Sequence, residues 1–220
     1  MRGEYMGSLV QLENVTKVIK GRTVLSQVTG TFGRNQITGI RGENGSGKTM
    51  LLRGISGLIK TDGRILFDGK EQLANGKFAQ NMGILIERPG FLNEFTGYKN
   101  LELLALLDRK KREIGDEIKK TLELVGLDPN DKRKFGKYSL GMKQRLGIAQ
   151  AIIFKPDVIL LDEPTNAIDE GGVEELINLL LKLRQQETTL IVASHDSSFL
   201  QKIADVTFVM KNGVLSEGEA

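Results

Sequence analysis

Three short apolar runs stand out in the pattern of hydrophobic and polar positions along the chain. They cover residues 36–40, 157–161 and 189–193, and each run ends at polar residues. Continuous apolar runs of this length are typical of strands that are covered on both faces. After the first run, leucine and isoleucine recur at helical spacing over residues 51–59, which predicts a helix that begins near Lys48. The alternation of strands and helices predicts an α/β fold with a mostly parallel sheet.

Other parts of the chain have different periodicities. Residues 9–32 and 63–69 combine turn residues with short apolar and polar alternations, which predicts a flanking subdomain of antiparallel strands. Between about residues 90 and 155 the spacing becomes mostly helical, which predicts an inserted helical subdomain. No Pro/Gly/Ser-rich linker divides the 220 residues. We therefore expect a single domain over residues 1–220, with the helical subdomain at about 90–155.

Composition narrows the classes of protein that fit these elements. With 40% hydrophobic and 27% charged residues, the chain resembles soluble globular proteins in composition. No apolar run approaches the roughly 18 residues that span a bilayer, and the first residues lack the apolar core of a secretory signal, so we expect a cytosolic protein. The charges, Lys+Arg 31 against Asp+Glu 28, are close to balance, which argues against a nucleic-acid partner.

Cysteine and histidine usage limits the chemistry further. The chain has no cysteine and a single histidine, His195. Disulfides, cysteine-ligated zinc and thiol catalysis are therefore excluded. Any bound metal should be a hard cation held by oxygen ligands.

A glycine-rich segment between the first strand and its helix matches the Walker A pattern G-x-x-x-x-G-K-[ST]. Glycines let backbone N–H groups turn toward phosphate oxygens, and the helix N-terminus adds its positive end. Lys48 should reach the β- and γ-phosphates of ATP, and the Thr49 hydroxyl should ligate Mg²⁺. A chance glycine turn is the alternative, but the flanking strand and helix favour a P-loop NTPase with a RecA-like sheet. The residues that we expect to bind nucleotide here are Gly42, Glu43, Asn44, Gly45, Ser46, Gly47, Lys48 and Thr49.

Two carboxylates follow the second apolar run. Asp162 lies at the end of that strand, where ligands of open α/β sheets gather, and we expect it to hold Mg²⁺ directly or through water. Glu163 should place a second carboxylate near the γ-phosphate, where it can orient the attacking water. Taken alone, an Asp-Glu pair after a strand indicates an ordinary loop start or helix cap. The Walker A segment upstream favours the catalytic interpretation.

The most discriminating segment precedes this pair and reads Tyr138-Ser139-Leu140-Gly141-Met142-Lys143-Gln144-Arg145. Ser139 is a good N-cap for the helix that follows. The segment resembles the Leu-Ser-Gly-Gly-Gln signature of the ATP-binding cassette (ABC) family, and the resemblance covers nearly the whole chain. It implies that Ser139, Gly141 and Lys143 bind the γ-phosphate of an ATP held by a second subunit, so that two subunits enclose two nucleotides head to tail.

Two further segments extend this resemblance. Residues 166–169 resemble the D-loop that couples the two sites across the dimer, and His195 resembles the switch histidine that contacts the γ-phosphate. The implied reaction is ATP hydrolysis. Lys48 and Mg²⁺ would neutralise the developing phosphate charge, Glu163 would handle the water, and His195 with Ser139 of the partner subunit would complete the γ-phosphate cage.

Three positions depart from the family's pattern. Lys143 replaces the signature glutamine, and a cation there would be favoured opposite a γ-phosphate. Glu87 takes the place of the Q-loop glutamine, and its carboxylate could still ligate Mg²⁺. Ile19 takes the place of the aromatic residue that usually stacks on adenine, so base stacking is weak or supplied elsewhere. With Arg88, Pro89, Gly90 and Phe91, these features resemble the exporter branch associated with bacitracin and lantibiotic resistance.

The resemblance implies an ATP-binding and ATP-hydrolysing subunit of an ABC transporter. It would be a peripheral protein on the cytoplasmic face of the cell membrane, working as a homo- or heterodimer beneath a separate integral membrane permease. The exported substrate would be an antimicrobial peptide, a drug or a lipid-like molecule. A non-transport ABC ATPase, or a catalytically weak ATP-dependent switch, is the alternative, and the ATPase activity of the purified protein would separate a switch from an enzyme.

Overall fold

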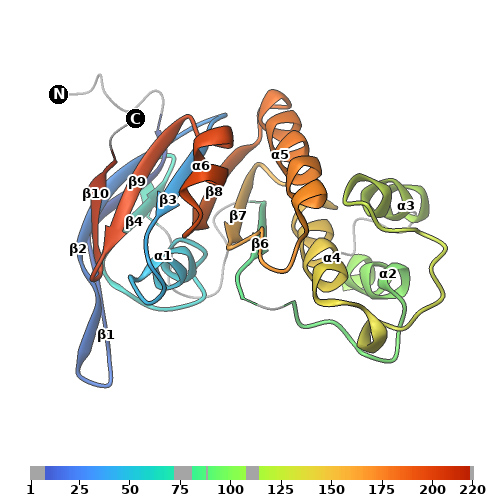
Figure 1. The fold of residues 1–220 in the computed structure, drawn as a ribbon. Coiled ribbons are helices and arrows are strands. Elements are labelled where there is room, and N and C mark those ends of the chain that lie inside the picture. Colours follow the sequence, from blue (N-terminus) through green and yellow to red (C-terminus); the bar gives the residue numbers. More distant parts are fainter. Residues whose placement is uncertain (1–7, 72–80, 88, 108–113, 219–220) are drawn as a thin grey trace.

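Two β-sheets and six α-helices make up the residues that the computed structural model describes, which are 8–71, 81–87, 89–107 and 114–218 (Figure 1). The smaller sheet is antiparallel and has the strand order β2-β1-β4-β5. Residues 9–32 form a hairpin of two long antiparallel strands. Its turn is at Lys20 and Gly21, and both of these residues have positive φ. The strands of this sheet are β1 (Ser8–Ile19), β2 (Arg22–Gly33), β4 (Asp62–Phe67) and β5 (Lys70–Glu71).

The larger sheet is mostly parallel and has the strand order β10-β9-β3-β8-β7-β6. Neighbouring strands from β9 to β6 run parallel, and β10 pairs antiparallel with β9 at one edge. The three strands expected at residues 36–40, 157–161 and 189–193 are confirmed as β3, β7 and β8. They are neighbours in the sheet, with β8 between β3 and β7. The strands of this sheet are β3 (Ile37–Arg41), β6 (Met82–Leu85), β7 (Val158–Asp162), β8 (Thr189–Ser194), β9 (Val206–Lys211) and β10 (Val214–Glu217).

The helices fall into two groups. In Figure 1, α1 lies near the strands, whereas α2 and α3 lie on the side of α4 that is farther from the sheets. The expected α/β fold class with an antiparallel sheet is confirmed. The division into a single domain over residues 1–220 with a helical subdomain at 90–155 stays a prediction. The helices are α1 (Lys48–Ile55), α2 (Gly97–Leu107), α3 (Gly115–Leu124), α4 (Leu140–Ile152), α5 (Glu170–Gln185) and α6 (Ser197–Ile203).

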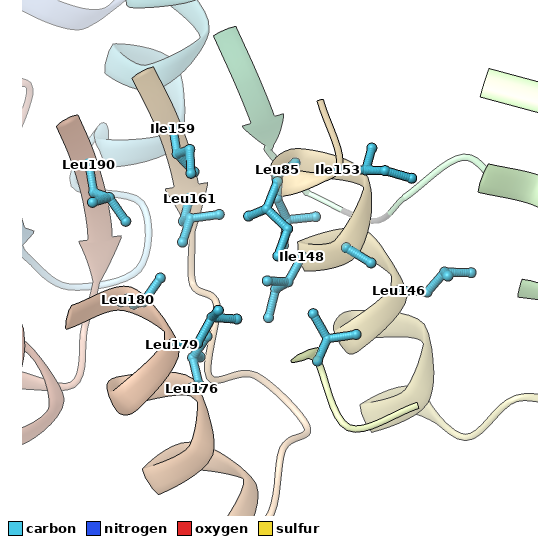
Figure 2. Packing of buried hydrophobic residues seen from close by; sticks show 14 of the residues in the cluster. Leu85, Leu146, Ile148, Ile153, Ile159, Leu161, Leu176, Leu179, Leu180 and Leu190 are labelled. Atoms are coloured by element: carbon cyan, nitrogen blue, oxygen red, sulfur yellow. The ribbon is translucent and has the colours of Figure 1, made fainter. Parts of the chain in front are cut away.

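The buried strands of the larger sheet separate two hydrophobic cores. Because successive side chains of a strand point to opposite faces, Ile159 and Leu161 of β7 pack with the helical side, and Val158 and Leu160 pack with the smaller sheet and α1. Figure 2 shows the first of these cores, where Leu180 of α5 lies beside the strands. The carboxyl end of β7 is therefore held from both faces, which fixes the polar residues that follow it.

We predict that Leu180→Ala lowers the free energy of unfolding by about 2 to 5 kcal/mol, because this side chain is fully buried and its removal leaves a cavity. Leu107→Ala is the matched control, because Leu107 is 80% exposed, and its effect should stay within about 0.5 kcal/mol. Urea denaturation followed by circular dichroism measures both values. Equal effects of the two substitutions would contradict the packing described above.

Candidate functional site: a phosphate loop, two carboxylates and a histidine

The loop between β3 and α1 takes a course that only glycine permits at several points. Gly45 and Gly47 have φ angles of 81° and 114°, a region that other residues rarely adopt. A Cβ at Gly42 would lie 2.4 Å from the carbonyl oxygen of Met210 on β9. The glycines of the Walker A pattern are therefore explained by the backbone path, and the loop wraps around the start of α1.

Lys48 is the first residue of α1 and is 5% exposed. Its Nζ atom donates hydrogen bonds to the carbonyl oxygens of Gly42 at 2.7 Å and Glu43 at 3.2 Å. The same atom lies 3.1 Å from Oε1 of Glu163, which follows β7. A buried cation thus connects the two ends of the phosphate loop to a carboxylate from another strand.

Asp162 and Thr49 form the second connection between α1 and β7. The Thr49 hydroxyl donates a hydrogen bond of 2.7 Å to Oδ2 of Asp162. Burial raises the pKa of the Asp162 carboxyl, the Thr49 hydrogen bond lowers the pKa, and the neighbouring Glu163 raises it again. Within the described part of the chain, Oδ1 of Asp162 and Oγ of Ser46 are buried and have no hydrogen-bond partner.

These oxygens fit a hard cation held together with phosphate. Carboxylate and hydroxyl oxygens are ligands that Mg²⁺ prefers, and Mg²⁺ usually binds through one or two protein groups plus substrate phosphates. Among the residues that the structure describes, no group of three or more His, Asp or Glu side chains could hold a metal. Thr49 and Asp162 are the residues that would hold such a cation beside a phosphorylated substrate.

Glu163 is oriented by several neighbours at once. Its φ of 48° is unusual for a residue other than glycine. The backbone N–H of His195 donates to the Glu163 carboxylate at 3.1 Å, and Nδ1 of His195 lies 2.7 Å from Oε2. The Ser194 hydroxyl donates to the same oxygen at 3.3 Å. The predicted base and the predicted switch histidine are thus in direct contact, and Ser194 is a contributor that the sequence pattern did not reveal.

Glu87 is close to the site but is paired with a cation. Its Oε2 atom lies 2.7 Å from Nη2 of Arg53 in the last turn of α1. It also lines a cavity of about 590 Å³ together with Lys48, Thr49 and Glu163. The expected role of Glu87 as a Mg²⁺ ligand stays a prediction, and the next residue, Arg88, lies outside the described residues.

Two cavities flank the phosphate loop, with volumes of about 840 and 590 Å³. Ligand pockets typically have about 300 to 1,000 Å³, so each has the size of a small-molecule site. His195 and Ser46 line the larger cavity, and Arg22 lines both. Ile19, the expected adenine contact, pairs with Arg22 across the β1–β2 hairpin and is 38% exposed. Sequence reasoning missed Arg22, whose only signal was its place just after the hairpin turn.

The residues of the signature segment line neither of the two cavities beside the phosphate loop. Ser139 caps α4, and its Oγ accepts a hydrogen bond of 3.2 Å from the N–H of Met142. Ser139 is exposed, and Leu140 beside it is 62% exposed. Gly141 packs so closely on the next loop that a Cβ would lie 2.6 Å from the Ala167 carbonyl oxygen. The capped helix end therefore faces outward.

Lys143 has a different environment from the one expected of a phosphate ligand. Its Nζ atom lies 5.3 Å from the centre of the Phe135 ring, within range of a cation–π interaction. Its expected contact with a nucleotide of the partner subunit stays a prediction. Most of the predicted site residues thus form two sets: those of the phosphate loop with Asp162, Glu163 and His195, and those at the start of α4. Ile19 lies on the β1–β2 hairpin, and Glu87 lies beside Arg53 of α1.

In the part of the chain that the structure describes, no helix combines the length and the apolar character that crossing a bilayer needs.

Known proteins are similar in sequence to almost the full length of this chain. The family model described as ABC transporter matches residues 25–166. The chain is 41% identical to the uncharacterized ABC transporter ATP-binding protein YybJ of Bacillus subtilis (strain 168), over 96% of each chain. It is 39% identical to the bacitracin transport ATP-binding protein BcrA of Enterococcus faecalis, over 96% of this chain and 69% of that protein.

A solved structure agrees with these likenesses. The dimeric structure of MJ0796, a bacterial ABC transporter cassette, superposes with a TM-score of 0.87 at 25% identity, over 96% of this chain and 100% of that one. The resemblance drawn from residues 42–49 and 138–145 is confirmed by the family model and the relatives. The chain belongs to the ABC transporter family of ATP-binding proteins.

Proposed function

We propose that this chain binds ATP with Mg²⁺ beside residues 42–49 and hydrolyses it to drive transport. The observation that carries the proposal is the convergence of three groups beside one glycine-rich loop. These groups are the Lys48 ammonium, the Thr49–Asp162 pair, and the Glu163 carboxylate in contact with His195. A cation, oxygen ligands for a metal and a base for water are the groups that phosphoryl transfer requires.

Each residue has a distinct role in the proposed reaction. Lys48 and the loop N–H groups bind the β- and γ-phosphates, and Thr49 with Asp162 holds the metal. When bound, Mg²⁺ neutralises charge that develops on the transferred phosphoryl group. Glu163 accepts a proton from the attacking water or orients it, and His195 keeps the Glu163 carboxylate in place at 2.7 Å.

The start of α4 completes a site on a second subunit in this proposal. Ser139 and Leu140 are exposed and do not line either cavity beside the phosphate loop. A capped helix N-terminus favours anions, so it suits the γ-phosphate of a nucleotide on another chain. The dimeric state of the related cassette supports this arrangement.

The relatives support a proposal for the class of transported substrate. We propose an exporter of antimicrobial peptides, in which this chain sits at the cytoplasmic face of the membrane under a separate permease. The support is the 39% identity to a bacitracin transport protein over nearly the whole chain, together with the Glu87 and signature departures that suggested this branch.

We predict that Glu163→Gln leaves ATP binding within about twofold of the parent and lowers kcat by a factor of at least about a hundred, because the amide cannot act as a base. Steady-state phosphate release measures kcat, and fluorescence titration with an ATP analogue measures binding. Glu174→Gln on the exposed side of α5 is the matched control and should behave as the parent. A Glu163→Gln protein with parental turnover would refute the assignment of the base.

A mixing experiment tests the shared sites. Lys48→Ala removes the phosphate contact but leaves the signature segment intact, and Ser139→Arg does the reverse. Each variant alone should be inactive, whereas an equimolar mixture should regain up to about a quarter of parental ATPase activity, since half of the dimers would carry one intact site. If the mixture is as inactive as the separate variants, while the parent hydrolyses ATP, the head-to-tail arrangement is wrong.

The proposed substrate class has its own test. Cells that express the chain with its cognate permease should tolerate several-fold more bacitracin than cells that express Glu163→Gln with the same permease. Growth inhibition in a dilution series measures the difference. If the two kinds of cells tolerate bacitracin equally, and also tolerate each of a panel of lantibiotics equally, the peptide-export proposal is contradicted but the ATPase proposal is not.

A further inference from the structure

The side chain of Gln144 joins α4, which carries most of the signature segment, to the backbone of the catalytic loop, the segment after β7 that begins with Glu163 and Pro164. Its Nε2 atom donates a hydrogen bond of 3.1 Å to the carbonyl oxygen of Glu163 and one of 3.2 Å to that of Pro164. Both acceptors are carbonyl oxygens, so only the NH₂ group of the amide can serve them, and its two N–H bonds match the two acceptors. Gln144 is half-buried, and both bonds leave its own helix for a segment about twenty residues farther along the chain.

The backbone that Gln144 contacts adopts a conformation that needs support. Glu163 lies in the left-handed region, with a φ of 48°, which non-glycine residues occupy only when their surroundings hold them there. On one side, His195 and Lys48 hold the carboxylate. On the other side, the N–H of Asn166 and the amide of Gln144 donate to the Glu163 carbonyl oxygen. The direction of the carboxylate is therefore fixed from both ends of the residue.

The Gln144 hydrogen bonds lie beside a cavity and close to the tight approach of Gly141 to the Ala167 carbonyl oxygen. The cavity has a volume of about 420 Å³, and its lining includes Leu140 and Lys143 of α4 together with Asp162 and Asn166. Farther along α4, Ile148 packs in the same core as Leu161 of β7 (Figure 2). The apolar packing anchors the middle of the helix, whereas the Gln144 hydrogen bonds connect its first turns to the catalytic loop.

We propose that Gln144 is a positioning residue that transmits the orientation of α4 to the Glu163 carboxylate. The inference rests on the proposed ATPase function. A tilt of the first turns of α4 would move the amide away from the Glu163 and Pro164 carbonyl oxygens, and the Glu163 backbone could then relax from its left-handed conformation. The carboxylate would no longer point at the attacking water. Gln144 thus couples the end of the helix that meets the partner subunit to the base within its own chain.

The test separates this role from a general effect on folding. Gln144→Met keeps the length and much of the packing but has no N–H donors, and Gln144→Glu keeps the shape but places a charged acceptor against two carbonyl oxygens. We expect Gln144→Met to lower kcat about tenfold while the KM for ATP and the Tm stay close to those of the parent, and Gln144→Glu to lower kcat further. Steady-state ATPase assays and thermal denaturation of the full chain give all three values.

Controls make each outcome decisive. Gln150→Met, on the same helix, should leave kcat, KM and Tm unchanged. A parental kcat in Gln144→Met would overturn the inference. A lowered kcat in this variant would also overturn it if the Tm fell clearly below that of the parent, or if the KM for ATP rose by a similar factor. If the parent hydrolyses ATP and Glu163→Gln abolishes that activity, such a result would leave the proposed function intact. If the parent shows no ATPase activity, both proposals fall together.

Discussion

The buried contact between Lys48 and Glu163 is the interaction on which the rest of the site depends. The two residues are far apart in sequence. Lys48 begins the helix after β3 and Glu163 follows β7, and strand β8 lies between these two strands in the larger sheet. Parallel strands bring their carboxyl ends to one edge of a sheet, so groups far apart in sequence meet there. The Lys48–Glu163 contact, at 3.1 Å, joins the phosphate loop to the loop after β7. The contact of Glu163 with His195 joins the loop after β7 to the loop after β8.

This arrangement suggests why a separate protein can control the reaction. In the proposed mechanism, phosphate oxygens compete with Glu163 for Lys48, so substrate binding and the position of the base are physically linked. Helix α4 lies outside this cluster and contacts it through the hydrogen bonds of Gln144 to the loop after β7. Forces on the helical side of the molecule can thus reach the base without a change in the sheet, which two hydrophobic cores hold from both faces.

The sequence predicted the parts of the structure whose signals are local. The apolar runs of β3, β7 and β8 and the glycine spacing of residues 42–49 were sufficient, because burial on both faces and tight turns leave direct traces in composition. The edge strand β10 and strand β9 were not predicted, since their half-exposed residues alternate less distinctly. The Gln144 hydrogen bonds and the Glu87–Arg53 pair were also missed. They depend on how distant segments dock, and no periodicity along the chain encodes that.

Equilibrium binding of ATP to the full chain in the presence of magnesium tests the central claim most directly. Titration calorimetry of the parent and of Lys48→Met would compare the site with and without its buried cation. The account predicts saturable binding by the parent below millimolar ATP and a loss of at least about tenfold in affinity for the variant, because charge-assisted contacts to phosphate are removed. Absence of binding by the parent, or equal affinity of the two proteins, would contradict it.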